Sequence, residues 1–206
     1  MFDISIRHDL DKLQKKLTGV ASRQLQFASA RTLTTLAQQT AAEEQKNMAK
    51  VLDRPTPFTV KSVKVRAARK DGLYATVFIQ DKAAAYLEPY EFGGTNKLNS
   101  KALIKPVNLK LNQYGNLPKA KLKQLKERAD IYIGKIKTKS GEVDGVWQRL
   151  KPTKGKPGGL KLLIRFADAH PVRQHLGYFS LAEKIVRKNF RQVMGRELAK
   201  AISSAK

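Results

Sequence analysis

The chain contains no cysteine among its 206 residues. Disulfide scaffolds, thiolate zinc sites and cysteine nucleophiles are therefore excluded. Acidic residues are also scarce, with 17 Asp and Glu against 41 Lys and Arg, so the formal net charge at pH 7 is +24. Aromatic residues make up only 7% of the chain, although 41% of the residues are hydrophobic. The composition argues against a fully disordered chain and predicts a folded protein with a strongly positive surface.

Long hydrophobic runs are absent too. The run Leu160–Ile164 is interrupted by Lys161, and it is far shorter than the ~18 apolar residues that a membrane-spanning helix needs. The first residues, Met1–Asp9, alternate apolar and polar side chains and lack the basic start and apolar middle of a signal peptide. We therefore expect a soluble protein that is not exported and has no membrane partner.

The positive charge is concentrated in one third of the chain. Residues 97–165 carry 18 basic and 4 acidic side chains, a net charge of +14. Such a block attracts polyanions or an acidic protein surface, and its binding weakens as salt rises. Base-stacking aromatics are sparse among these lysines, with only Tyr114, Tyr132 and Trp147. The charge alone leaves nucleic acid, an acidic protein and a solvated loop as alternatives.

The hydrophobic spacing predicts a chain that mixes helices and strands, hence an α+β fold. A long N-terminal helix and a C-terminal amphipathic helix are expected to pack on a small, mainly antiparallel sheet. Residues 1–206 are expected to form one domain, with 97–130 as a lysine-rich insertion or long loop. The expected helices cover residues 9–20, 20–50, 83–90, 118–129 and 180–203; the expected strands cover 2–6, 63–67, 74–79, 131–136, 145–150 and 160–166, the last three forming a meander.

No group of residues has the spacing of a catalytic or metal site. His170 and His175 have only Asp168 nearby as a third ligand, which favours ordinary surface histidines. Glu88 and Glu91 lie on one short element, so a helix-capping or ion-pair role is favoured over paired-acid catalysis. The glycine-rich stretch 155–159 lacks the spacing of a phosphate-binding loop. We therefore expect no enzymatic activity, no cofactor and no metal.

Several short segments follow one another in an order typical of a known protein class. A long helix with Ala30-Arg-Thr-Leu-Thr-Thr-Leu-Ala37 precedes Arg54-Pro-Thr-Pro-Phe-Thr59 and Tyr86-Leu-Glu-Pro-Tyr-Glu-Phe-Gly-Gly-Thr95. After the basic stretch come Ile131-Tyr-Ile-Gly134, Gly145-Val-Trp-Gln-Arg149 and Tyr178-Phe-Ser-Leu-Ala-Glu-Lys184. In this order the chain resembles the tail-completion or neck proteins of long-tailed bacteriophages, in particular the minor tail protein Z-like group. The piece Glu91–Thr95 also resembles the Glu-Phe-Gly-Thr signature of related head-tail connector proteins.

This resemblance implies a structural virion protein that is made in the bacterial cytoplasm. It would complete the head-proximal end of the tail and join tail to head, as a homo-oligomeric ring, a hexamer, around the DNA passage. Its protein partners would be the tail terminator or tail tube and the head-tail connector. The residues expected at protein contacts are Glu88, Tyr90, Glu91, Phe92, Gly93, Gly94, Trp147 and Arg149. For these residues, burial in a turn or in the meander is the alternative.

Six lysines of the basic stretch are candidates for contact with DNA or with an acidic protein. They are Lys101, Lys105, Lys110, Lys119, Lys121 and Lys123. The alternative function is a nucleic-acid-binding basic protein, ribosome- or nucleoid-associated. The basic block favours it, whereas the lack of a helix-turn-helix, zinc or RNA-binding sheet signature argues against it.

Overall fold

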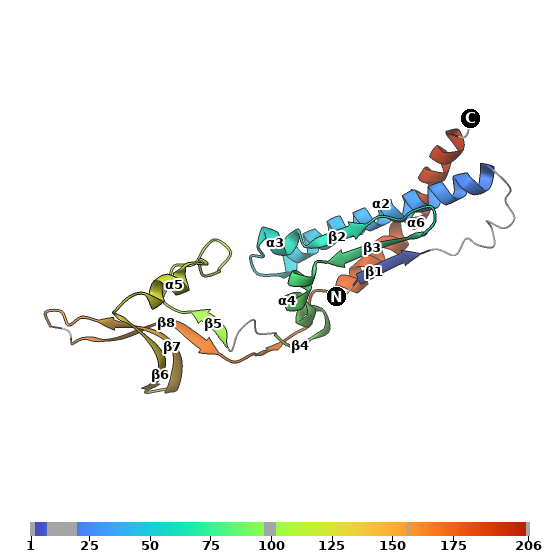
Figure 1. Cartoon of the computed structure of the whole chain (residues 1–206). Coiled ribbons are helices and arrows are strands. Elements are labelled where there is room, and N and C mark those ends of the chain that lie inside the picture. The colour runs from blue at the N-terminus through green and yellow to red at the C-terminus, as the bar shows by residue number, and fades with distance from the viewer. Residues whose placement is uncertain (1–2, 8–19, 97–101, 156, 205–206) are drawn as a thin grey trace. The chain divides into compact units, whose positions relative to one another are not determined.

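The computed structural model describes residues 3–7, 20–96, 102–155 and 157–204. It has the expected α+β fold, with long N-terminal and C-terminal helices packed together and small antiparallel sheets (Figure 1). The chain divides into two compact units. Met1–Gly93 and Arg173–Lys206 form the first, here called the helix unit, and Gly94–Val172 form the second, here called the sheet unit. The basic segment 97–130, predicted as an insertion, belongs to the sheet unit.

The helix unit is built on two helices that lie side by side. Helix α2 (Val20–Val51) packs along α6 (Tyr178–Ser203) and also contacts strands β2 (Val63–Arg66) and β3 (Tyr74–Ile79). Strand β1 (Asp3–Arg7) completes an antiparallel sheet of order β1-β3-β2. These elements confirm the long helix, the hairpin and the first strand expected from the sequence. The helix expected over residues 9–20 lies outside the described residues, apart from Val20.

The threonines of α2 are accommodated by local hydrogen bonds. Thr32 Oγ1 donates to Ala28 O at 2.8 Å, and Thr34 Oγ1 donates to Ala30 O at 2.8 Å and accepts from the Ala68 N–H at 3.1 Å. Threonine is a mediocre helix former because its branched side chain loses rotamer freedom. Packing therefore has to stabilise α2, and its buried side chains supply it: Leu25, Ala28, Leu33, Leu36, Ala37, Ala41 and Met48.

Two short helices flank the β2–β3 hairpin in the chain. Helix α3 (Pro57–Val60) begins at Thr56, whose hydroxyl oxygen accepts from the Thr59 N–H at 3.2 Å. Helix α4 (Asp81–Phe92) ends at Gly93, where φ is 76°. This left-handed conformation favours glycine, so the expected helix closed by glycine is confirmed.

The sheet unit contains an antiparallel sheet of order β5-β8-β7-β6. Strands β6 (Ile131–Thr138), β7 (Gly141–Leu150) and β8 (Gly159–Ala167) form the expected meander. Strand β5 (Leu103–Pro106) pairs with β8 inside the stretch that was expected to be a loop. Strands β4 (Gly94–Thr95) and β9 (Pro171–Val172) form a separate two-stranded ladder.

Helix α5 (Lys121–Lys126) covers part of one face of this sheet, together with Leu109 and Leu117 of the loop that precedes it. It is shorter than the helix expected over residues 118–129. Its Leu122 and Leu125 pack in one cluster with strand residues Val146, Ile164 and Phe166. The sheet unit therefore has a small hydrophobic core of its own.

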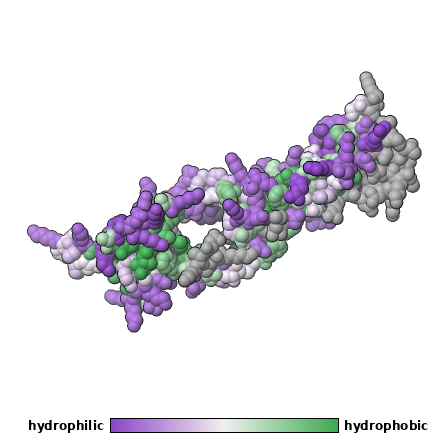
Figure 2. Space-filling model, in the orientation of Figure 1, coloured by the Kyte–Doolittle hydropathy of each residue, from purple (hydrophilic) through white to green (hydrophobic). Residues whose placement is uncertain are grey.

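Hydrophilic side chains cover much of the visible surface in Figure 2. Among the described residues, no helix is both long and apolar enough to cross a membrane.

Candidate interaction surfaces

The segment Glu88–Gly94 is divided between the interior and the surface. Glu91 is 4% exposed, and its carboxylate accepts the backbone N–H groups of Tyr178 at 2.8 Å and Phe179 at 3.3 Å. These are the first N–H groups of α6, whose N-cap residue Gly177 has no side chain to cap them. The helix-capping role expected for this pair of glutamates is thus confirmed for Glu91, whereas Glu88 is half-buried on α4.

A second carboxylate lies beneath this cap. Glu44 of α2 is fully buried, and its two oxygens have no hydrogen-bond partner among the described residues. Burial, and to a lesser degree the nearby charge of Glu91, raise the pKa of Glu44 to about 8. Burial and the Glu44 charge also raise the pKa of Tyr178. Glu44 therefore lies in the interior of the helix unit, closed off from solvent.

The other side chains of the segment lie nearer the surface. Phe92 is 56% exposed and lies 5.9 Å from the ring of Phe179, which is 37% exposed. Tyr90 is half-buried; its carbonyl accepts the N–H groups of His175 and Leu176, and its ring meets His175 edge-on. Gly93 and Gly94 have φ values of 76° and 107°. The exposed aromatic pair suits a protein contact, whereas the glycines serve the turn.

Trp147 and Arg149 of β7 take different positions. Trp147 is 6% exposed, and its indole Nε1 donates to Gly134 O at 3.1 Å. Arg149 is exposed and has no ion pair among the described residues. The nearby acid, Asp130, is bound by Arg128 at 2.6 Å and by Gln148 at 2.9 Å instead. Trp147 therefore packs the meander, and Arg149 is left for solvent or a partner.

The candidate lysines do not gather in one patch. Lys101 lies outside the described residues, and Lys110 is exposed in the loop after β5. Lys119, Lys121 and Lys123 belong to the segment around α5, whereas Lys105 lies on β5. Lys105 stands directly opposite Arg165 of β8. Sequence analysis missed Arg165, although it follows the apolar run of its strand and continues the alternation that begins there.

Cross-strand register assigns the residues of this sheet to two faces, because directly paired residues point to the same side. The helix face, which α5 covers, includes Ile131, Val146, Ile164 and Phe166. The open face has no helix of the sheet unit packed on it. It carries Lys105 and Arg165, opposite Gly145 and Gly134 in one row, then Tyr132, Trp147 and Leu162 in a second row, and Arg149 with Leu160 in a third.

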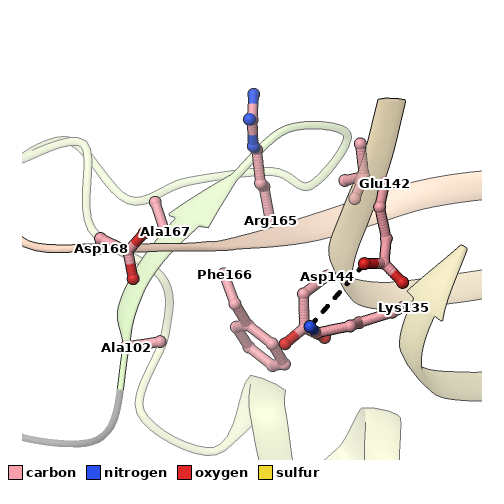
Figure 3. Close-up of a pocket in the computed structure, with 9 residues that line it drawn as sticks. Ala102, Lys135, Glu142, Asp144, Arg165, Phe166, Ala167 and Asp168 are labelled. Carbon is pink, nitrogen blue, oxygen red and sulfur yellow. Dashed lines mark ion pairs between the residues drawn. The ribbon is translucent and has the colours of Figure 1, made fainter. Parts of the chain in front are cut away.

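A polar hollow lies beside the helix face, lined by Lys135, Glu142, Asp144, Phe166 and Asp168 among others (Figure 3). Lys135 Nζ pairs with Glu142 Oε2 at 3.8 Å, and both side chains are more than half exposed. In Figure 3, Arg165 projects from β8 on the side opposite Phe166. Over the described parts of the chain, no group of His, Asp or Glu could hold a metal ion. The hollow therefore shows a solvated ion pair rather than a metal site.

The fold and surfaces define a structural class: an α+β chain with a helix-pair unit and a cationic sheet unit. No family model, no curated protein and no solved structure matches the chain.

Proposed function

We propose that this chain is a structural virion protein of a bacteriophage tail or neck. It completes the head-proximal end of the tail and mediates head-tail joining, as a ring of identical copies around the DNA passage. Its other partners are the tail terminator or tail tube and the head-tail connector. The proposal begins from the resemblance of the ordered segments, above all Glu91–Thr95, to tail-completion and connector proteins.

The observation that carries the proposal is that neighbouring residues of that segment have different environments, one buried and one exposed. Glu91 is buried and holds the first turn of α6 through two backbone N–H groups. The next residue, Phe92, is 56% exposed beside Phe179. Exposed aromatic pairs are favourable at protein interfaces because they bury a large apolar area when covered. The segment thus links a rigid junction to a surface that a neighbouring subunit could cover.

The open sheet edges support the same function. Strands β1 and β2 are the edges of the sheet in the helix unit, and β5 and β6 are the edges in the sheet unit. An edge strand presents unpaired backbone groups to which another chain can add. A ring-forming protein uses such edges and faces, since each copy then covers its neighbour.

The test is a phage that carries Phe92→Ser in this chain, examined by negative-stain electron microscopy. The matched control is Phe58→Ser, because Phe58 of α3 is 55% exposed in the same unit. We expect free heads beside separate tails for Phe92→Ser and for deletion of the gene, and joined particles for Phe58→Ser. Joined, infectious particles after deletion of the gene would overturn the proposed function. Failure of both point variants would instead remove the role of Phe92.

A further inference from the structure

The cations of the open face have no ion-pair partners among the described residues, although Asp130 lies across from Arg149 and is bound by Arg128 and Gln148. Lys105, Arg149 and Arg165 are exposed, and none of them forms an ion pair with any residue that the structure describes. The strand acids, Glu142 and Asp144, lie on the helix face, where Asp144 stands opposite Lys135. Figure 3 shows Arg165 projecting away from these two acids. The two strand acids and the three cations therefore lie on opposite faces, and the open face can attract anions from outside the chain.

The spacing of these cations fits an extended polyanion. Lys105 and Arg165 are direct neighbours across two strands, whereas Arg149 lies four residues along β7 from Gly145, the register partner of Arg165. At a rise of about 3.4 Å per residue, that is a separation of about 14 Å. At this backbone separation a chain of phosphates can meet the three cations without their side chains having to converge on one point.

The surface between the cations is formed by closely packed side chains. Gly134 and Gly145 stand opposite each other beside Arg165, and the space over them is filled by Tyr132 and Leu162, whose atoms lie 2.8 Å and 2.9 Å from where a Cβ on each glycine would be. Trp147 of the same face is buried, and its indole N–H donates to the carbonyl oxygen of Gly134. Besides, Tyr132 is the one aromatic ring of the open-face rows that is substantially exposed, at 38%.

The small number of exposed aromatic rings favours double-stranded over single-stranded nucleic acid as the ligand of this face. Proteins that bind single strands stack successive bases on several exposed aromatic rings. Contacts to a duplex, in contrast, go largely to phosphate oxygens from Lys and Arg side chains. With three free cations and one exposed ring, the open face matches the duplex.

We propose that the open face of the sheet unit binds the phosphate backbone of duplex DNA through Lys105, Arg149 and Arg165. This inference deepens the proposed function, on which it rests for the source of the DNA, because it names the surface that faces the passage. The contact is independent of base sequence, since these cations would reach phosphates rather than base edges.

The experiment measures binding of the full-length chain to a duplex of about thirty base pairs over a range of salt concentrations. The test variant combines Lys105→Gln, Arg149→Gln and Arg165→Gln. The control variant combines Lys135→Gln, Lys137→Gln and Lys161→Gln, which removes the same charge from the helix face of the same unit. A single strand of equal length and a polyglutamate of matched charge are the comparison probes.

We expect the test variant to lose at least tenfold in duplex affinity and the salt slope to fall by about 2 to 3, near 0.9 for each lost phosphate contact. The control should lose less than threefold. Equal losses in both variants, or no duplex binding by the unmodified chain near physiological salt, would overturn the proposal. Equal or greater loss of polyglutamate binding in the test variant would assign the face to an acidic protein instead. Head-tail joining is scored separately in phage, so either proposal can fail without the other.

Discussion

At the residue scale, Glu197 shows how a buried carboxylate becomes stabilising. It is 2% exposed on α6 and is bound by Arg31 of α2 at 2.9 Å, Lys200 at 3.2 Å and Arg196 at 3.3 Å. The Arg31 hydrogen bond above all holds the pKa of Glu197 below its usual range. Since the folded pKa is lowered, this stabilisation is present above the unfolded pKa and is lost as the pH falls through the folded value.

We therefore expect Glu197→Gln to lower the free energy of unfolding by about 1–3 kcal/mol at pH 7, less than for a fully buried pair because its three partners are half exposed. Urea unfolding at pH 7 and near pH 3 measures this difference, which should shrink at the lower pH. Glu183→Gln is the control, since the Glu183–Arg187 pair is exposed and should change stability by less than about 0.5 kcal/mol. Equal effects of the two variants would contradict the role of Glu197.

Glu44 presents the opposite case, because its buried carboxyl has no hydrogen-bond partner among the described residues. Its pKa is raised to about 8 in the folded state by burial first and by Glu91 second. The folded state therefore holds a proton that the unfolded chain releases above about pH 4.5, so the stability falls as the pH rises between these two values. The pKa of Tyr178 is raised as well, by burial first and then by the charges of Glu44 and Asp3.

Replacing Glu44 by a neutral residue should remove the loss of folding stability at high pH. We expect Glu44→Gln to be more stable than the unmodified chain by about 2–4 kcal/mol at pH 8, at roughly 1.4 kcal/mol for each pKa unit less the cost of the buried amide. At pH 5 the two proteins should differ little. Urea unfolding across this pH range is the measurement, with Glu43→Gln, an exposed neighbour paired with Lys46, as the control. A pH dependence that persists in Glu44→Gln would refute this assignment.

At the element scale, the pairing of β7 with β8 depends on one missing side chain. A Cβ on Gly145 would collide with the backbone oxygen of Ile164 and would come within 2.9 Å of Leu162. Because the backbone of β8 cannot shift without losing its pairing with β7, Gly145→Ala should separate the strands and destabilise the sheet unit by more than about 2 kcal/mol. Gly159 has no neighbour within 4 Å of its would-be Cβ, and Gly159→Ala should be almost neutral. The fluorescence of Trp147, the one tryptophan of the chain, reports unfolding of this sheet.

Elements with a strong local pattern could be predicted from the sequence. Helix α2 has a continuous stripe of small and apolar residues, and the β2–β3 hairpin has a turn at Asp71-Gly72. Strand β5 could not be predicted from the sequence. It has only four residues, of which one is a lysine and one a proline, and it forms a strand only through pairing with β8, some sixty residues away. Long-range pairing leaves no periodic signal in so short a segment.

The same reason limits prediction of the candidate surfaces. The role of Glu91 depends on Tyr178, 87 residues further along the chain. The lysine clusters of the sequence lie on β5, on α5 and in the loop between them, whereas the open face combines one of those lysines, Lys105 of β5, with Arg149 and Arg165 from two other strands. Residues that are far apart in the sequence can share one face of a sheet, and the pairing register of the strands, which the sequence does not show, determines which ones do.

At the scale of the whole molecule, the positive charge is shared by both units. The sheet unit, residues 94–172, carries 18 basic and 5 acidic side chains, a net charge of +13, and the rest of the chain carries +11. Copies that assemble into a ring would repel one another unless anions offset this charge. A duplex running along the open faces would supply such anions, and this links the proposed assembly to the proposed DNA contact.

The two units also have separate cores, and this predicts how the molecule unfolds. Within the described residues, the core cluster of the helix unit has fifteen buried members and that of the sheet unit has four, Leu125, Val146, Leu163 and Ile164. Apolar burial scales with stability, so the sheet unit should unfold at a lower urea concentration. Trp147 fluorescence should then change before the helical circular dichroism, which comes mainly from α2 and α6.

Variants in each unit make this expectation specific. Glu197→Gln lies in the helix unit and should move only the circular dichroism transition, whereas Gly145→Ala lies in the sheet unit and should move only the fluorescence transition. A single cooperative core would instead give coincident transitions that both variants shift together. Duplex DNA provides a further test. If it binds the open face, it should raise the midpoint of the fluorescence transition with the logarithm of its concentration and leave the helical transition in place. Stabilisation of the helical transition alone would place the DNA contact on the helix unit.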